Sequence, residues 1–328
     1  KGWPSTAVSS WLNGGLFGGG GINFTNPAGY FMGGYDSGQL DSVDHWSFPA
    51  DVGTALTITL TDDARNAYGF GNDGVAGYTG IGQGSSSFMS AVDKLTYSVG
   101  TFAALGTGLS AAARGQAAMS NVAVAGYVSL GDQSNTYVQT VDKFAYSDDS
   151  RTTLATGLNN TASYAMGFSN SGTAGYIGAG YSWSGGYTFY TTVNKYAFPS
   201  DSHSTLGTGL PTSQLFNPGG MADSGTAGYT LGGGASAAGE STVVSKFAFP
   251  GDTRSTLGTG LSVVSRYGCA MADSGVAGYM ALGNSYSIGQ LSELDKFAFP
   301  SDSRSALTMV VDRSNRASAF ANCSALAP

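Results

Sequence analysis

The sequence predicts an all-β fold, a six-bladed β-propeller of four-stranded antiparallel blades. Its main support is a segment repeated six times along the 328 residues, which reads LDKFAFPSDSRSAL at Leu294 to Leu307 in the last copy. The copies recur about every fifty residues, the length of one propeller blade. A second mark, Ala-Gly-Tyr, recurs with nearly the same period. The composition, with 51 Gly and only 11% charged residues, is typical of turn-rich β proteins.

Both marks can be followed through the whole chain. The Lys position of the repeated segment is occupied by His45, Lys94, Lys143, Lys195, Lys246 and Lys296. The tyrosines of the second mark are Tyr30, Tyr78, Tyr127, Tyr176, Tyr229 and Tyr279. Because the repeat is uninterrupted, residues 1–328 are predicted to form a single propeller domain.

Each unit divides into four short segments that are separated by Gly, Asp and Ser turns, as expected for four strands. A leucine stands eleven residues after each Lys position and is predicted to be core: Leu56, Leu105, Leu154, Leu206, Leu257 and Leu307. Five copies carry an aspartate six residues after the Lys position, and the second copy has Gly100: Asp51, Asp149, Asp201, Asp252 and Asp302. These aspartates are interpreted as turn residues, and the basic residues of the repeat as architecture that pairs with nearby Asp or extends to solvent.

The sequence contains seven candidate first-strand segments but only six copies of each of the other three strands. The extra first-strand segment lies at an end of the chain. Six blades with an interlocked closure are the preferred interpretation. The alternative is a seventh, two-stranded partial blade from residues 1–12 and 314–328. Cys269 and Cys323 both fall in first-strand segments, so a disulfide across the seam and two separate buried thiols are both open.

These marks resemble kelch-type repeats. The kelch Tyr is matched six times, and the second kelch Gly is matched by Gly34, Gly82, Gly131, Gly180, Gly233 and Gly283. The first kelch Gly is retained only as Gly33 and Gly232, and leucines replace the kelch Trp. The near-copied, weakly charged repeats are also similar to those of phage tail-fibre and bacterial surface proteins. This resemblance implies a propeller located outside a cell or on a virion, and it implies no particular function.

Several classes of function are disfavoured. The net charge of −7 argues against a nucleic-acid partner, and no apolar stretch is long enough for a membrane span. The two histidines, His45 and His203, both lie on repeat positions in different units, so no metal site, cofactor or catalytic residue is predicted. The arginines that open first strands are a candidate anion-binding ring: Arg65, Arg114, Arg266 and Arg316.

The copies differ most in the segment between the second and third strands, which is expected to emerge on one face of every blade. These segments supply six candidate ligand-binding aromatics: Tyr35, Tyr137, Tyr181, Trp183, Tyr187 and Tyr286. Aromatic planes among amides and hydroxyls are suited to sugars. Capping of the blade ends or contact with other subunits is the alternative role for them.

The leading hypothesis is a non-enzymatic module that binds a glycan or a cell-surface receptor. A secreted glycan-acting enzyme and a scaffold subunit of a larger extracellular assembly are the alternatives.

Overall fold

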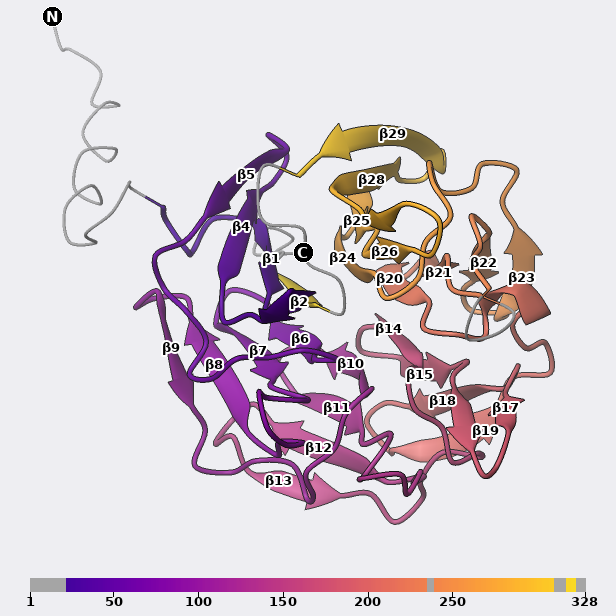
Figure 1. The fold of residues 1–328 in the computed structure, drawn as a ribbon, viewed down its shortest axis with the longest axis horizontal. Coiled ribbons are helices and arrows are strands. Elements are labelled where there is room, and N and C mark those ends of the chain that lie inside the picture. Colours follow the sequence, from indigo (N-terminus) through magenta and orange to yellow (C-terminus); the bar gives the residue numbers. More distant parts are fainter. Residues whose placement is uncertain (1–21, 235–238, 310–316, 323–328) are drawn as a thin grey trace, which may run out of the picture.

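The computed structural model describes residues 22–234, 239–309 and 317–322. Six four-stranded antiparallel sheets stand around a central axis as the blades of one ring (Figure 1). The predicted six-bladed propeller is therefore confirmed. Among the described residues, helix is limited to the short 3-10 turn η1 (Thr212–Gln214), and no helix there could cross a membrane.

Each blade runs from an inner strand at the axis to an outer strand at the rim. The inner strands are β30 (Ser318–Asn322), β6 (Tyr68–Asn72), β10 (Ala117–Asn121), β14 (Met166–Asn170), β20 (Gly219–Asp223) and β24 (Cys269–Asp273) of blades 1 to 6. The second strands are β1 (Ala28–Met32), β7 (Ala76–Gly80), β11 (Ala125–Ser129), β15 (Ala174–Gly178), β21 (Ala227–Leu231) and β25 (Ala277–Ala281).

The repeated segment forms the third strand of each blade and the turn that follows it. The third strands are β4 (Val43–Ser47), β8 (Val92–Thr96), β12 (Val141–Ala145), β18 (Val193–Ala197), β22 (Val244–Ala248) and β28 (Glu293–Ala298). The outer strands are β5 (Val52–Ala55), β9 (Thr101–Ala104), β13 (Arg151–Thr153), β19 (Ser202–Thr205), β23 (Thr253–Thr256) and β29 (Ser303–Thr308).

The ring closes by joining the two ends of the chain in blade 1. Strand β30 pairs antiparallel with β1, with Phe320 opposite Tyr30. This confirms the interlocked closure, and it corrects the alternative, because residues 318–322 form the inner strand of blade 1 and not part of a seventh blade. Residues 1–12, the other half of that alternative, lie outside the described residues.

The glycine of Ala-Gly-Tyr is required by the contact between neighbouring blades. A Cβ added at Gly77 would overlap the Phe320 ring, and one at Gly126 would overlap the Phe70 ring. Both rings come from the inner strand of the preceding blade. The glycine therefore makes room for the neighbour, while the tyrosine that follows it is at most 1% exposed in every blade.

A carboxylate clamp joins five of the six seams between blades. In each, the tyrosine hydroxyl and the lysine Nζ of one blade donate to the two oxygens of an aspartate in the next blade, at 2.5–2.8 Å. The clamps are Tyr78–Lys94–Asp149, Tyr127–Lys143–Asp201, Tyr176–Lys195–Asp252, Tyr229–Lys246–Asp302 and Tyr279–Lys296–Asp51. The predicted pairing of the repeat lysines with aspartate is confirmed, and the turn aspartates hold the ring as well as the turn.

The seam between blades 1 and 2 lacks this clamp. His45 replaces the lysine and Gly100 replaces the aspartate, and neither the Tyr30 hydroxyl nor His45 Nε2 has a hydrogen-bond partner among the described residues. Phe24 instead lies against Tyr30, with ring centroids 6.2 Å apart and the planes nearly parallel. A Cβ on Gly100 would stand 2.7 Å from the Phe24 ring. This seam is therefore packed with aromatic rings.

The predicted core position of the repeat leucines is confirmed in part. All six, from Leu56 to Leu307, are half-buried at the end of the outer strand and pack against the buried core clusters from the rim. The fully buried leucine stands four residues later in five units: Leu60, Leu109, Leu158, Leu210 and Leu261.

A test of the clamp is Asp149→Asn, with Asp148→Asn as its control in the same turn. Asn tolerates the left-handed backbone at position 149, where φ is 57°, but it loses the charge that faces Lys94 Nζ. Because both partners are about one quarter exposed, we expect a loss of about 1 kcal/mol in the free energy of unfolding. Urea denaturation measures it, and equal effects of the two substitutions would contradict the assigned role.

The buried histidine predicts a pH dependence of stability. Burial lowers the pKa of His45 because it disfavours the imidazolium. As pH falls below the ordinary value of about 6.5, the unfolded chain binds a proton that the folded chain does not, so stability falls until the folded pKa is reached. His203, whose pKa burial also lowers, contributes in the same direction. His45→Gln should lose less stability than wild type between pH 7.5 and 5.5 in urea titrations. An unchanged pH dependence would show that the pKa of His45 is the same in the folded and unfolded states, which would contradict the prediction.

Candidate functional site

The variable segments all emerge on one face of the ring. Met32 at the end of β1 pairs with Ser318 at the start of β30, and Gly80 of β7 pairs likewise with Tyr68 of β6. Second strands therefore end on the face where inner strands begin. We call this the loop face, and the opposite side, which carries the turns of the repeated segment, the turn face.

In three blades the variable segment folds into a small two-stranded ribbon. These ribbons pair β2 (Tyr35–Asp36) with β3 (Gly38–Gln39), β16 (Tyr181–Trp183) with β17 (Tyr187–Phe189), and β26 (Asn284–Ser285) with β27 (Gly289–Gln290). Each begins beside a glycine in the left-handed region, such as Gly180 with φ of 88°. A Cβ on Gly180 would stand 2.6 Å from the carbonyl oxygen of Ser163, which explains why glycine recurs there.

Aromatic side chains gather on the loop face above blades 3 to 6. This aromatic cluster contains Tyr137, Tyr164, Tyr181, Trp183, Tyr187, Phe189, Phe216 and Tyr267. Its centre is the buried Tyr181, whose ring stacks on Tyr164 at 5.4 Å and on Phe216 at 5.2 Å. Burial raises the pKa of the Tyr181 phenol well above its usual value, so the group stays neutral.

The outer edge of the aromatic cluster is open to solvent. Trp183 and Tyr187 face each other across the β16–β17 ribbon with centroids 4.6 Å apart. They are 46% and 50% exposed. The pair thus presents two fixed aromatic surfaces on a short, hydrogen-bonded ribbon.

The structure brings four of the six predicted aromatics together. Tyr137, Tyr181, Trp183 and Tyr187 belong to the aromatic cluster. The other two stand apart, each against an arginine: Tyr35 lies under Arg65 at 5.1 Å, and Tyr286, 72% exposed, lies under Arg266 at 5.3 Å.

The predicted arginine ring is only partly described. Arg65, Arg114 and Arg266 stand at equivalent places on the loop face, and Arg316 lies outside the described residues. Arg114 Nε donates to Asp132 at 3.0 Å, and Arg266 Nε is 3.9 Å from a Glu240 oxygen. These carboxylates offset two of the positive charges and would compete with a bound anion, so the ring stays a prediction.

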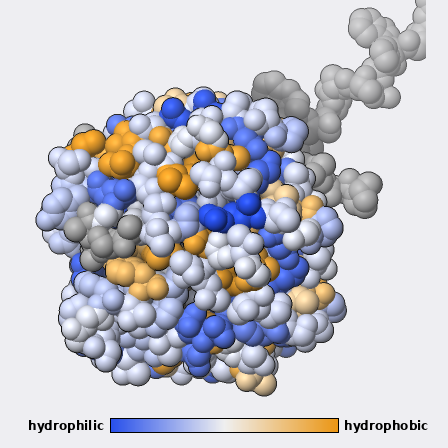
Figure 2. Space-filling model, turned by 90° about the vertical axis from the view of Figure 1, so that its right-hand side faces the viewer, coloured by the Kyte–Doolittle hydropathy of each residue, from blue (hydrophilic) through white to orange (hydrophobic). Residues whose placement is uncertain are grey.

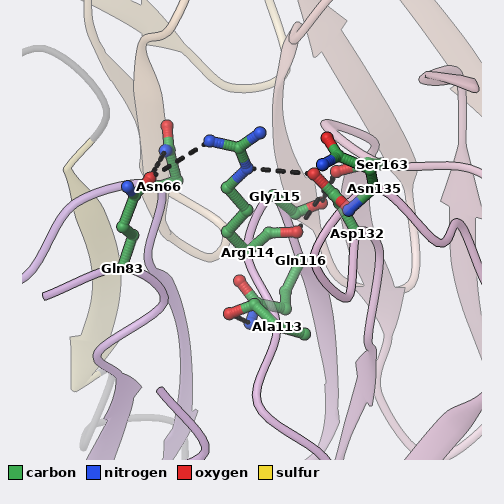
Figure 3. Close-up of polar contacts among 9 residues, drawn as sticks. All are labelled: Asn66, Gln83, Ala113, Arg114, Gly115, Gln116, Asp132, Asn135 and Ser163. Carbon is green, nitrogen blue, oxygen red and sulfur yellow. Dashed lines mark hydrogen bonds and ion pairs between the residues drawn. The ribbon is translucent and has the colours of Figure 1, made fainter. Parts of the chain in front are cut away.

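The ion pair of Arg114 continues into a chain of amides (Figure 3). Arg114 Nη1 donates to Gln83 Oε1 at 3.3 Å, and Asn66 Nδ2 donates to the same oxygen at 3.3 Å. An arginine can only donate, so Gln83 must present its oxygen, and Asn66 must present its nitrogen. The Asn66 carbonyl oxygen is thereby left facing away from this chain.

A cavity of about 100 Å³ lies at the axis where the inner strands begin. All six blades line it, and its polar and aromatic side chains include Asn66, Gln116, Tyr164, Asn217 and Tyr267. It is therefore the mouth of the central channel on the loop face. Tyr164 and Tyr267 belong to both the cavity and the aromatic cluster, so the two adjoin.

Two carbonyl oxygens at this mouth have no hydrogen-bond partner among the described residues. They are Asn66 Oδ1 and Gln116 Oε1, and each residue is only 5% exposed. The Gln116 amide is oriented by its nitrogen, which donates to the Ala113 carbonyl at 2.7 Å. A buried polar group left without a partner costs about 1–3 kcal/mol, so both acceptors are unfavourable for folding alone.

The backbone at the mouth is strained as well. Tyr164 and Tyr267, immediately before the inner strands, both have φ of 58°. Tyrosine rarely adopts this left-handed conformation, and it persists only where the surroundings enforce it. Here the Tyr164 amide donates to the Gly115 carbonyl of the neighbouring blade at 2.7 Å. The equivalent residues Asn66, Gly115 and Asn217 also have positive φ, of 51°, 65° and 50°, so this conformation belongs to the repeat.

The turn-face mouth is different, because its hydroxyls join neighbouring blades. A cavity of about 200 Å³ there is lined by serines of successive inner strands. Ser169 Oγ accepts the Ser120 amide at 2.7 Å, and Ser224 Oγ accepts the Ser171 amide at 3.0 Å. These polar groups are therefore accounted for by architecture.

The sequence did not single out Asn66 or Gln116, although Gln116 carried a signal. It stands where the other units have Ala67, Ala165, Pro218, Gly268 and Ala317. A long amide among small residues at the crowded axis is a departure from the repeat. Its free oxygen could be found only from the folded network.

No metal site is formed by the described part of the chain, where no three His, Cys, Asp or Glu side chains converge. His45 on β4 and His203 on β19 stand in blades 1 and 4. Cys269 is buried at the start of β24, and burial raises the pKa of its thiol to about 12. Cys323 lies outside the described residues, so the disulfide stays a prediction.

The rim has a mixed character. Viewed from the side of blades 4 and 5, its hydrophobic residues form separate patches among hydrophilic ones (Figure 2). On the side shown, the surface does not form one continuous apolar band. The loop face therefore remains the stronger candidate for ligand binding.

Comparison with known proteins finds neither a matching family model nor a matching characterised sequence. The propeller fold is thus shown by the structure, and the resemblance to kelch repeats remains a prediction from the repeat marks.

Proposed function

We propose that the chain is a non-enzymatic module that binds glycans through the aromatic cluster of its loop face. The observation that carries this proposal is the Trp183–Tyr187 pair, half-exposed and fixed on the β16–β17 ribbon. Aromatic planes stack on the apolar faces of sugars, and nearby polar groups bond their hydroxyls. Ser182 Oγ and the Tyr190 hydroxyl, 2.7 Å apart, are polar groups of the same variable segment.

A location outside a cell or on a virion is part of this proposal. It is supported by the low charge, the Gly-rich composition and the kelch-like repeats, which are similar to those of phage tail-fibre and surface proteins. A glycan or glycosylated receptor on a cell surface is the partner this location implies. The propeller would then be a rigid platform from which the variable segments make contact.

The test is a glycan array followed by calorimetry on the strongest binder, with wild type, Trp183→Ala and Tyr187→Ala. We expect each substitution to weaken binding about tenfold, which corresponds to about 1.4 kcal/mol, because each removes one stacking plane. Val124→Ala, which trims an exposed side chain in a turn between β10 and β11, is the control and should bind as wild type.

Three outcomes would contradict the proposal. An array without any bound glycan would favour a scaffold role, which oligomerisation of the purified chain would support. Undiminished binding by both variants would move the site away from the aromatic cluster. Cleavage or modification of an array glycan would favour the glycan-acting enzyme.

A further inference from the structure

The seam between blades 1 and 2 carries a titratable group at the place where the other five seams have the lysine of a clamp. His45 lies on β4 directly opposite Tyr30 of β1, and the two rings meet edge to face at 5.5 Å. The residue is only 8% exposed. Neither His45 Nε2 nor the Tyr30 hydroxyl has a hydrogen-bond partner among the described residues. A neutral imidazole therefore packs among aromatic rings at this seam.

No carboxylate of the described elements around His45 is placed to pair with it. Asp44 lies on the opposite face of β4, where it acts on Cys269 of blade 6. Asp51 binds Lys296 of blade 6 at 2.6 Å. Asp93 of β8 accepts two hydrogen bonds from Thr61, at 2.7 and 2.6 Å. Burial is accordingly what lowers the pKa of His45.

The remaining titratable groups of the two blades do not change this balance. Lys94 of blade 2 faces the other way, into its clamp with Asp149 of blade 3 at 2.7 Å. Burial raises the pKa of the Tyr30 phenol, which stays neutral. Protonation of His45 would thus place a positive charge in an apolar seam without a counter-ion, which is unfavourable.

An open seam relieves this cost, because water can reach the imidazolium there. In the open form the pKa of His45 returns to its ordinary value of about 6.5, whereas in the closed form it is lowered. The open form therefore binds more protons than the closed one as pH falls below about 6.5. Acid shifts the balance towards opening until the pKa of the closed form is reached.

The axial edge of the same seam is joined by groups that do not titrate in this range. Thr79 of β7 and Ser318 of β30 share a hydrogen bond of 2.7 Å. The Phe320 ring fills the space that Gly77 leaves beside it. The axis can therefore act as the hinge, and the blades part on the rim side, where β5 and β9 lie (Figure 1).

We propose that the seam between blades 1 and 2 is an acid-responsive opening of the ring, and that protonation of His45 parts the two blades at the rim. Opening uncovers the rings of Phe24, Tyr30 and Tyr97, which are buried in the closed form. The other five seams are held by paired charges, so the response belongs to this seam alone. The inference goes beyond the proposed function and does not depend on glycan binding.

The repeat provides two matched reporter positions. Val43 begins β4 and Val141 begins β12, both are at most 1% exposed, and each packs in the core between its blade and the next. Val43→Cys reports on the seam between blades 1 and 2, and Val141→Cys on the clamped seam between blades 3 and 4. Alkylation by iodoacetamide, located by peptide mass spectrometry, separates these thiols from Cys269 and Cys323. Rates are divided by that of free cysteine at the same pH.

Between pH 7.5 and 5.5 we expect the normalised rate of Val43→Cys to rise by up to about tenfold, the limit for an open-state histidine of ordinary pKa. The rate of Val141→Cys should change little. Adding His45→Gln should abolish the rise. His203→Gln is the matched control, because it removes the other histidine whose pKa burial lowers, and it should leave the rise intact.

Several results would overturn the inference. Equal rises at both seams would report acid unfolding of the whole ring, and the absence of a rise at Val43→Cys would show that the seam stays closed. A rise that persists with His45→Gln, or that is lost with His203→Gln, would assign the response to another group. The comparison of the two reporters retains His45, so it decides the matter even where His45→Gln does not fold.

Discussion

The ring depends on one contact, the aspartate carboxylate that each clamp places between two blades. A tyrosine hydroxyl and a lysine ammonium from one blade meet it, as Tyr127 and Lys143 meet Asp201. The lysine also lies over the tyrosine ring, 5.2 Å from its centroid in this clamp. The carboxylate reaches both donors because its residue adopts the left-handed conformation of the turn. The aspartate thus belongs to the turn and also binds the neighbouring blade, so it recurs in five of the six units.

At the seam between blades 1 and 2, the lysine and the aspartate of the clamp are both replaced, by His45 and Gly100. With His45 in place of lysine, an aspartate at position 100 would lose its charged partner. Gly100 instead leaves room for Phe24, which packs on Tyr30, and Tyr97 stacks on the other side at 6.0 Å. A polar clamp is replaced by stacked rings, and the buried imidazole is kept neutral as its lowered pKa indicates. The two solutions satisfy the same requirement, which is a filled seam without an uncompensated charge.

Most of the fold was predictable because every blade meets the same two neighbours and repeats the residues that those contacts need. The period predicted the number of blades, and the surplus first strand at the C-terminal end predicted the interlocked closure. The partner of each aspartate was not predictable, because Tyr78 and Asp149 are separated by an entire blade. The repeat leucines contact the core as predicted, but identity in every copy does not give the degree of burial, and Leu257 packs on the core from the half-buried rim.

The site was predictable in part, for a physical reason. Divergent loops indicated the aromatics, but only the folded ribbon brings Trp183 and Tyr187 into contact, edge to face. Tyr35 and Tyr286 lie apart from them, each against an arginine. Asn66 and Gln116 were missed because a free acceptor is a property of a network. It follows from the orientations of Arg114 and Gln83, which no spacing in the sequence reveals.

The two mouths of the channel share one symmetry and differ in how they use polar groups. On the turn face, serine hydroxyls accept amides of the neighbouring blade, so each group stabilises the ring. On the loop face, the ring is held by backbone bonds such as Tyr164 to Gly115, and two buried oxygens stay unpaired. A residue with positive φ stands at the same place in five blades, and its backbone bonds to the neighbouring blade, as Tyr164 does to Gly115. The two mouths therefore join the blades through different groups, side-chain hydroxyls on the turn face and the backbone on the loop face.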